Sequence, residues 1–380
     1  MTERLVVAGV TTRALALSAS RAGYQVTAVD AFGDLDLRGA AEVLTLRQDS
    51  ARRYSPSAAA AAAASVPADL AAYTSNFENY PDAVARLSRG RTLLGNPPAV
   101  LRRVRDPIEL MRALRRRGFP TPNTRASCPS DGGAWLVKPR RSGGGHNIVP
   151  WRGGRSVPRT RYLQERIAGR PGSIVFAADG RNAVLLGLTR QLVGDARFGS
   201  TGFRYCGSLL ASEEVALFPD QDRLLGTAAA LAEAVTMEFG LVGLNGLDFI
   251  AREGVPYPVE VNPRFSASME LIERAHGLSM FRLHERACRG TLPVAPGPVR
   301  RAFGKAIVFA RRNVTLADTG RWLASTWVAD VPHPRERIGR GHPVCTVFEE
   351  AGDAAACYRG LIRRADQVYH AAESRARGAA

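Results

Sequence analysis

The sequence predicts a multidomain chain of α/β and α+β class, with a Rossmann-like domain at its N-terminus and a small β region at its C-terminus. An apolar strand at residues 5–9, a helix at 11–22 and a second strand at 25–30 form the βαβ pattern of a parallel sheet. Residues 172–177 and 183–188 instead follow one another as paired strands. At 380 residues, the chain is long enough for two or three domains with cores of their own.

The first turn of the βαβ unit carries no phosphate-binding fingerprint. Gly9 stands alone, and the G-x-G-x-x-G pattern of dinucleotide-binding folds is missing. Asp30 lies about twenty residues further on, where such folds hold a ribose, but it fits a surface strand end equally well. The sequence therefore favours a structural α/β domain over a dinucleotide site.

The next segment predicts a helix, a strand and then a polar loop. Residues 57–65 are a polyalanine run, and residues 69–80 pass from apolar to polar. Loops after parallel strands carry ligands in α/β folds, so the polar residues of this loop are candidates to line a cleft. They are Thr74, Ser75, Asn76, Glu78 and Asn79. A capped helix start at Asn79 or Asp82 explains the same residues equally well.

Residues 135–148, WLVKPRRSGGGHNI, predict a strand, a basic glycine-rich turn and a second strand. Glycines let backbone N–H groups approach phosphate oxygens closely. A glycine loop alone is most often a hairpin turn, and this one lacks the G-K-[ST] ending of a P-loop. Lys138 adds to the signal because it and Lys305 are the only lysines among 52 basic residues. A compact ammonium fits between phosphate oxygens as a guanidinium does not.

Residues 241–264, LVGLNGLDFIAREGVPYPVEVNPR, predict a β-hairpin that gathers oxygen ligands. Alternation along the second strand puts Val259 and Val261 on one face and Glu260, Asn262 and Arg264 on the other. Pairing of the strands brings Asp248 next to Glu260 and Asn262. Carboxylate and amide oxygens suit Mg²⁺ bound with substrate phosphates, and a guanidinium suits developing negative charge. The alternative is an amphipathic hairpin with a solvated acidic face.

The remaining segments complete the predicted order of elements. Residues 101–122 predict a helix from about Asp106 that ends in Gly118 and two prolines. Residues 212–239 and 265–277 predict helices, 300–310 a strand, and 330–347 short strands around proline and glycine turns. Ser266 and Ser268, at the front of the second of these helices, are candidates for an anion pocket, although helix capping explains them nearly as well.

Several of these motifs, in this order, resemble those of the ATP-grasp superfamily, in its carboxylate–amine ligase type and its biotin carboxylase-related branch. The D-F-I and E-V-N-P-R segments resemble its metal-binding hairpin, and K-P-R-R-S-G-G-G resembles its phosphate lysine and mobile flap. G-F-P-T-P resembles the end of the helix before its central domain, and L-Q-E-R-I-A-G resembles its adenine-binding strand. The resemblance covers most of residues 101–290 and implies an ATP-grasp fold whose N-terminal domain is the Rossmann-like pre-ATP-grasp domain.

The resemblance also implies roles for individual residues. The magnesium ligands would be Asp248, Glu260 and Asn262, with Arg264 and Lys138 as the catalytic cations. The ATP-binding residues would be Lys138 at the α- and β-phosphates, the flap residues Ser142, Gly143, Gly144 and Gly145, and the adenine segment Gln164, Glu165, Arg166 and Ile167. Where the family often carries a first ATP-contacting lysine, this sequence has Arg105. It also lacks an M-K-M biotin attachment site, because Lys305 lies in G-K-A.

The function implied by the resemblance is that of an ADP-forming ligase. ATP and Mg²⁺, with Mn²⁺ as a substitute, would activate a small-molecule carboxylate as an acylphosphate that a small-molecule amine attacks. Within the superfamily, the sequence as a whole is most similar to ligases associated with the biosynthesis of one-carbon coenzymes. The alternatives are kinase-type phosphoryl transfer without ligation, and a basic nucleic-acid-binding protein on a degenerate ATP-grasp scaffold.

Composition limits the partners and the location. The formal net charge is +17, but arginines are spread along the chain and have no aromatic interleaving, so we expect no nucleic-acid partner. The sequence has no apolar run of about 18 residues or more and no signal-peptide pattern, so we expect a cytoplasmic protein without a membrane partner. The five cysteines show no pairing pattern. A homodimer stays open.

We expect four parts along the chain. They are an N-terminal α/β domain at residues 1–100, a linker helix and central flap subdomain at 101–169, a subdomain with the metal hairpin at 170–295, and a small β region with a helix at 296–380.

Overall fold

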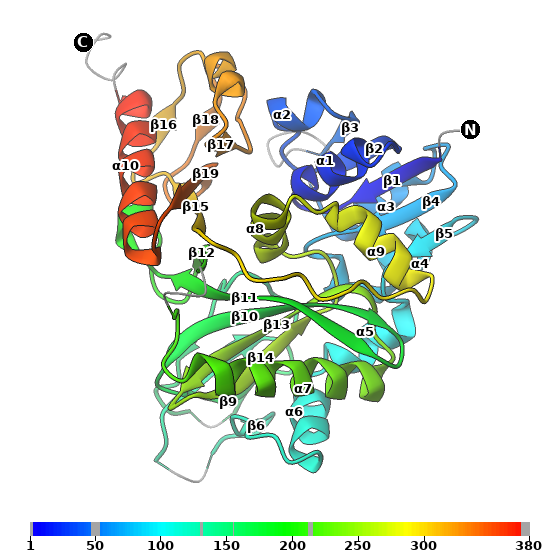
Figure 1. Ribbon diagram of the computed structural model, residues 1–380, viewed down its shortest axis with the longest axis vertical. Helices are drawn as coiled ribbons and strands as arrows, with labels where there is room; N and C mark the ends of the chain where they lie inside the picture. The colour runs from blue at the N-terminus through cyan, green and yellow to red at the C-terminus, as the bar shows by residue number, and fades with distance from the viewer. Residues whose placement is uncertain (1–2, 47–53, 130–131, 155, 212–215, 374–380) are drawn as a thin grey trace.

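The computed structural model describes residues 3–46, 54–129, 132–154, 156–211 and 216–373 (Figure 1). The N-terminal part is a five-stranded parallel sheet of order β3-β2-β1-β4-β5. Its strands are β1 (Arg4–Ala8), β2 (Gln25–Asp30), β3 (Glu42–Thr45), β4 (Leu70–Tyr73) and β5 (Thr92–Leu94). The helices beside it are α1 (Arg13–Arg21), α2 (Leu35–Arg38), α3 (Pro56–Ala63), the short 3₁₀ helix η1 (Phe77–Asn79) and α4 (Pro81–Leu87).

The sequence accounts for this sheet directly. The residues of β1 from Leu5 to Ala8 are all buried, as expected of a parallel strand covered on both faces. Asp30 is also buried, and its carboxylate accepts hydrogen bonds from Thr12 N at 2.6 Å and from Phe32 N at 2.7 Å. Burial raises the pKa of Asp30 despite these bonds. Asp30 therefore closes two loops of the domain from a buried position, which corrects the expectation of a surface strand end.

The second sheet is a small antiparallel one of order β6-β9-β7-β8. It consists of β6 (Thr124–Arg125), β7 (Trp135–Pro139), β8 (Val149–Pro150) and β9 (Arg161–Glu165), and two helices precede it, α5 (Pro98–Val104) and α6 (Pro107–Arg116). Asp106 caps α6 by accepting from Ile108 N at 2.8 Å and Glu109 N at 3.0 Å. The glycine-rich turn lies between β7 and β8, as the sequence predicted.

The third sheet is the centre of the molecule and has the order β14-β13-β10-β11-β12-β15-β19-β17. Its strands are β10 (Arg170–Asp179), β11 (Ala183–Val193), β12 (Tyr205–Leu210), β13 (Val242–Arg252), β14 (Val255–Asn262), β15 (Ala302–Phe309), β17 (Val328–Ala329) and β19 (Pro343–Ala351). The other elements after β9 are η2 (Ala196–Phe198), α7 (Gln221–Phe239), α8 (Ala267–His276), α9 (Met280–Cys288), β16 (Val314–Thr315), η3 (Gly320–Ala324), β18 (Arg337–Ile338) and α10 (Ala354–Glu373). The C-terminal strands β15, β19 and β17 thus continue this sheet.

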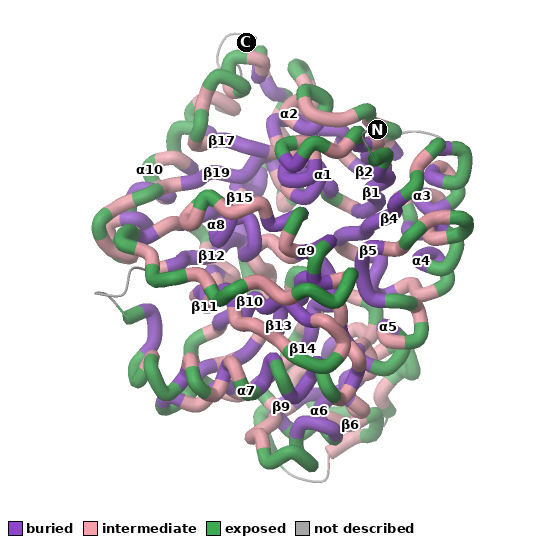
Figure 2. The backbone as a smooth tube through the Cα atoms, turned by 45° about the vertical axis from the view of Figure 1, so that its right-hand side comes forward, coloured by how far each residue is buried: buried purple, intermediate pink, exposed green. Residues whose placement is uncertain are grey.

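Alternating side chains of the third sheet form two cores. Ile174 and Phe176 of β10 pack in the core that also contains residues of α7 and α10. Val175 and Ala177, between them, pack in the core shared with α8, α9 and the N-terminal sheet. Figure 2 shows the strands as mostly buried segments and the helices as covering layers. Over the described residues, no helix is both long and apolar enough to cross a membrane.

Candidate functional site

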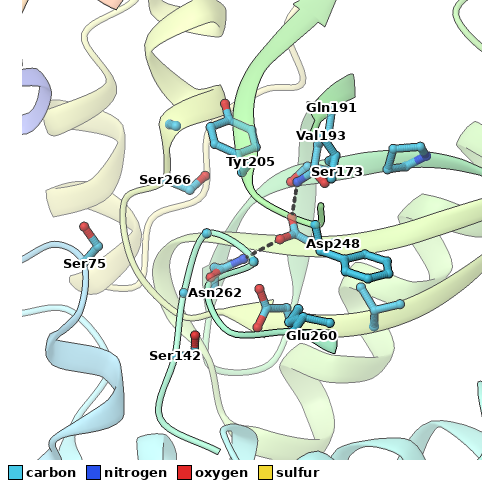
Figure 3. Close-up of a pocket in the computed structure, with 18 of the residues that line it drawn as sticks. Ser75, Ser142, Ser173, Gln191, Val193, Tyr205, Asp248, Glu260, Asn262 and Ser266 are labelled. Atoms are coloured by element: carbon cyan, nitrogen blue, oxygen red, sulfur yellow. Dashed lines mark hydrogen bonds between the residues drawn. The ribbon is translucent and has the colours of Figure 1, made fainter. Parts of the chain in front are cut away.

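One cavity of about 720 Å³ opens where the three sheets meet (Figure 3). Its lining includes every residue that the sequence analysis assigned to metal, phosphate or adenine. These are Lys138, Ser142, Gly143, Gly144, Gly145, Gln164, Glu165, Arg166, Ile167, Asp248, Glu260, Asn262 and Arg264. Arg13, Ser75, Arg105, Lys305 and Asp330 line the same cavity and come from other parts of the chain.

The acidic centre of the cavity is built by the β13–β14 hairpin. Asp248 stands opposite Glu260, and Gly246 stands opposite Asn262. Asn262 Nδ2 donates to Asp248 Oδ2 at 3.1 Å, and Gln191 Nε2 from β11 donates to Asp248 Oδ1 at 2.9 Å (Figure 3). The register shifts once, so that Val259 stands opposite no residue of β13. At this bulge, Val259 lines the cavity and is not part of the core, whereas Val261 lies in the core and also borders the cavity. This corrects the simple alternation expected from the sequence.

The two carboxyl groups of this centre have opposite pKa shifts. Burial and the neighbouring Glu260 carboxylate raise the pKa of Asp248 to about 7. Burial also acts to raise the pKa of Glu260, but the cations Arg105, Lys138 and Arg264 outweigh it and lower that pKa. Two carboxyl groups side by side without a cation between them repel each other when both are ionised.

These ligands fit a magnesium ion that is shared with a phosphate. No group of three or more His, Cys, Asp or Glu side chains that could hold a metal alone occurs in the described parts of the chain. Mg²⁺ is usually held by one or two carboxylates and completes its octahedron with water and substrate phosphates. Asp248, Glu260 and the Asn262 oxygen provide such an incomplete set.

Arg264 lies directly behind this centre and is almost completely buried. Its Nη1 donates to Phe265 O at 3.0 Å, and its Nη2 donates to Asn262 Oδ1 at 3.1 Å. Its Nη2 is also 2.8 Å from Oε1 of Glu78, a fully buried residue of η1 in the N-terminal part. Its Nε has no partner among the described residues. The Nε of Arg264 is therefore a buried donor that no described residue uses, whereas its two Nη groups are held by Phe265, Asn262 and Glu78.

Arg105, which the resemblance suggested as a replacement for the family's first ATP-contacting lysine, has its donors engaged within the protein. It donates to Asn79 Oδ1 through Nε at 3.2 Å and Nη2 at 2.9 Å, and to Ser142 O at 3.1 Å. Its Nη1 donates to Val261 O at 2.8 Å and Glu260 Oε2 at 3.4 Å. Arg105 thus joins η1, the glycine-rich turn and the acidic strand. Glu78 and Asn79 thus contact Arg264 and Arg105, the two arginines beside the acidic centre.

The glycine-rich turn lies against the loop before β12. Tyr205 N donates to Gly144 O at 3.0 Å, and Asn79 Nδ2 donates to Ser142 O at 3.3 Å. A Cβ on Gly145 would lie 1.8 Å from Phe203 O, and Gly145 has a φ of +74°. Both the space and the backbone conformation therefore require glycine at this position.

We expect Gly145→Ala to prevent the turn from taking this position, since the methyl group overlaps a backbone carbonyl. The strained φ adds a penalty of about 1 kcal/mol or more. ATP turnover should fall by about 10²-fold, because a turn that cannot close leaves the reacting groups misplaced. Steady-state kinetics tests this, with Gly143→Ala as the control, because a Cβ on Gly143 meets no atom within 4 Å. Equal activity of the two variants would contradict the prediction.

The four residues of the predicted adenine segment all line the cavity. The side chain of Gln164 accepts from Lys138 Nζ at 2.9 Å, and that of Glu165 accepts from Asn123 N at 3.0 Å. The N–H groups of Glu165 and Arg166 donate to Asn123 O and Ala134 O, both at 2.8 Å. The N–H of Ile167 is the first in this segment that has no partner within the described structure. It is therefore the available donor for an adenine edge.

A second charged group lines the cavity and was not predicted as a unit. We name it the Arg13 cluster: Arg13, Lys305, Asp330 and Thr346, which line the cavity, and Glu270, which pairs with Arg13 and Lys305. Lys305 Nζ lies 2.7 Å from Glu270 Oε2, so its ammonium is paired with a protein carboxylate. The position of Lys138 is consistent with the prediction that the lysines bind phosphates. The position of Lys305 is not, because its ammonium group is already paired with Glu270. Lys305 reaches Glu270 of α8 because of the register of β15 in the large sheet, which the sequence alone does not reveal.

The Arg13 cluster predicts an acid-sensitive contribution to stability. Burial alone would raise the pKa of Glu270, but Arg13 and Lys305 hold it far below its ordinary value of 4.5. A lowered folded-state pKa stabilises the fold above the unfolded pKa, and this stabilisation is lost as pH falls. We expect the free energy of unfolding in urea to decrease below about pH 4.5, with a shallower decrease in Glu270→Gln. Identical pH slopes of the two proteins would contradict this.

The helix N-terminus predicted to receive an anion also lies at the cavity. Ser266 and Ser268 at the start of α8 both line it. Ser266 Oγ has no partner in the described structure, whereas Ser268 Oγ bonds with Thr189 Oγ1 at 3.2 Å. Gln191 carried no recognisable signal in the sequence, because only the register of β11 brings it to Asp248.

Comparison with known proteins bears on the family and the fold of the chain. Residues 104–268 match the family model of the ATP-grasp domain. An uncharacterised protein of Methanocaldococcus jannaschii is 28% identical over 116 residues, which span 30% of this chain and 28% of that relative.

Three solved structures illustrate the similarity of fold. Pyruvate carboxylase of Rhizobium etli superposes with a TM-score of 0.73 at 13% identity over 95% of this chain, which spans only 37% of that enzyme. The L-amino acid ligase of Bacillus licheniformis gives 0.66 at 14% identity, covering 96% of this chain and 97% of that one. N5-carboxyaminoimidazole ribonucleotide synthetase of Thermus thermophilus gives 0.67 at 17% identity, covering 95% and 98%. The chain therefore contains an ATP-grasp domain, as its motifs predicted, and has the fold of the ATP-grasp superfamily.

Proposed function

We propose that this protein is an ADP-forming ligase that activates a carboxylate as an acylphosphate and joins it to an amine. The observation that carries the proposal is the composition of one cavity, where a carboxylate pair and an amide lie between Lys138 and the buried Arg264. Proteins with the same fold include an L-amino acid ligase and a carboxyaminoimidazole synthetase.

The residues divide the chemistry as follows. Lys138 binds the phosphates, and Ile167 N–H receives the adenine. Asp248, Glu260 and Asn262 would hold a magnesium ion, which would neutralise charge on the phosphates. The free Nε of Arg264 and the hydroxyl of Ser266 are the nearby donors for the reacting carboxylate, at the positive N-terminus of α8. The glycine-rich turn excludes water from the acylphosphate, which would otherwise hydrolyse.

Hydroxylamine tests this function without knowledge of the natural amine. It is a small nucleophile that converts an acylphosphate into a stable hydroxamate. Purified protein with ATP, Mg²⁺ and hydroxylamine is screened against a panel of carboxylic acids, and ADP, AMP, phosphate and hydroxamate are measured.

Each outcome decides between reactions. ADP, phosphate and hydroxamate that all depend on one carboxylate are the expected result. ADP with a stable phosphorylated product and no hydroxamate would establish the kinase-type alternative. AMP formation, or no ATP use with any acid, would overturn the proposal.

A further inference from the structure

The Arg13 cluster lies at the opposite end of the cavity from the predicted nucleotide. Arg13 belongs to α1, and Asp330 and Thr346 belong to the β17–β19 region, whereas Lys138 and Ile167 belong to the sheet with β7 and β9. Both views place α1, β17 and β19 toward one end of the molecule and β9 toward the other (Figures 1 and 2). A second substrate at the Arg13 cluster would reach the acidic centre from the side opposite to ATP.

The cations of this cluster are already paired. Arg13 Nε donates to Asp330 Oδ1 at 2.9 Å, Arg13 Nη2 donates to Glu270 Oε2 at 3.1 Å, and Arg13 Nη1 also contacts Glu270. Lys305 Nζ donates to Glu270 Oε2 at 2.7 Å. A third carboxylate, Asp36, lies 3.6 Å from Arg13 Nε. A phosphate placed here would meet carboxylates without an uncommitted cation, whereas a cationic group would be attracted.

Asp330 is held in an unusual backbone conformation at this place. Its φ is +53°, and among the described non-glycine residues with positive φ it alone lines the cavity. The N–H groups of Asp330 and Val331 donate to Asp36 Oδ2 and Oδ1, both at 2.9 Å, and hold the turn. Its side chain is 25% exposed. Its Oδ1 accepts from Arg13 Nε, and its Oδ2 accepts from Arg13 Nη2 and Thr346 Oγ1, so Oδ1 is the oxygen that can accept a further hydrogen bond. Backbone strain of this kind persists where surrounding contacts impose it, often at ligand sites.

We infer that the Arg13 cluster receives the amine substrate as a primary ammonium group paired with Asp330, and that this amine carries no phosphate. The inference rests on the proposed ligase function. Asp330 acts as an anchor, because the adjacent Arg13 keeps its carboxylate ionised. Hydroxyl groups of Thr346, Thr11 and Ser75 line the same end and suit the remaining hydrogen bonds of an amine.

The reaction balances without a protein base. The amine nitrogen forms a bond to the acyl carbon, and the bond from that carbon to the phosphate oxygen breaks. The two protons that the ammonium loses leave with the phosphate as dihydrogen phosphate, so the acylphosphate dianion and the ammonium give a neutral amide and a monoanion.

The experiment compares amines with hydroxylamine in the same protein. With the acid found in the hydroxamate screen, the wild-type chain is offered amino acids, their amides, diamines, ethanolamine, phosphoethanolamine and phosphoserine. We expect the accepted amines to be unphosphorylated. In Asp330→Asn, the KM for the accepted amine should rise by about tenfold or more, and the ratio of amide to hydroxamate should fall.

The matched control is Asp220→Asn. Asp220 is also an aspartate with positive φ, 51°, but it lies at the start of α7 outside the cavity. Asparagine tolerates this conformation, but Asp330→Asn also breaks the ion pair with the buried Arg13. Circular dichroism therefore verifies that both variants are folded before their KM values are compared. The wild-type amine panel gives a second test that needs no variant.

Three results would overturn the inference. They are preference for phosphoethanolamine over ethanolamine, an unchanged amine KM in Asp330→Asn, and hydroxamate formation with no amide from any amine offered. Absence of hydroxamate itself would instead overturn the proposed function, and the inference with it.

Discussion

Glu260→Gln is expected to lower ATP turnover by about 10³-fold while the protein stays folded. The amide keeps the size of the side chain but removes the negative charge that faces Arg105, Lys138 and Arg264. It also removes one of only two carboxylates available to magnesium at this centre. The measurement is ADP formation at increasing Mg²⁺, together with circular dichroism to verify folding. The Mg²⁺ concentration for half-maximal rate should rise.

The same hairpin provides a control for this prediction. Glu253 lies at its tip, where its side chain is 84% exposed and pairs only with Arg252 at 3.7 Å. Glu253→Gln changes charge and side chain in the same way but outside the cavity, so it should keep wild-type turnover. If both variants were equally active, Glu260 would not be a metal ligand and the whole assignment of the hairpin would fall.

The parts of the site that the sequence could predict are local ones. Asp248, Glu260, Asn262 and Arg264 are close in sequence, so a turn and strand alternation are enough to bring them together. The glycine-rich turn was predictable for the same reason, since its strands β7 and β8 flank it directly. Strand alternation gave the wrong position for Val259, which lies at a bulge. Bulges depend on how two strands pair, and this cannot be read from one strand alone.

The remaining parts depend on contacts between segments far apart in the chain. Gln191 reaches Asp248 only through the order of strands in the large sheet. The Arg13 cluster joins α1, α8, β15 and the loop after β17, and no single stretch of sequence contains it. The polar loop at residues 74–79 is an example of what the sequence alone could not predict. Its residues indicated either a cleft or a helix start, and only the fold showed that Glu78 and Asn79 meet Arg264 and Arg105.

Glu78→Gln is expected to lower ATP turnover, although Glu78 is not among the residues that line the cavity. Glu78 is 0% exposed, and among the described residues its carboxylate is the one ion-pair partner of Arg264 outside the acidic centre. Breaking a buried ion pair destabilises a protein by about 3–5 kcal/mol, so the midpoint of urea unfolding should fall. The freed guanidinium can turn toward Glu260 and Asp248, which would neutralise the magnesium ligands. We therefore expect turnover to fall by about 10²-fold with a smaller change in the KM for ATP.

Two comparisons separate this positioning role from simple loss of stability. Glu238→Gln breaks ion pairs with Arg116 at 3.2 Å and Arg117 at 3.1 Å on the surface, so it should lower stability by less than about 1 kcal/mol and leave turnover intact. Glu78→Asp keeps the charge and should recover part of the turnover. If Glu78→Gln unfolded more easily but reacted as fast as wild type below its unfolding transition, Glu78 would only stabilise the fold. Loss of turnover in the folded protein, partly restored by aspartate, would show that the N-terminal domain sets the position of the reacting arginine.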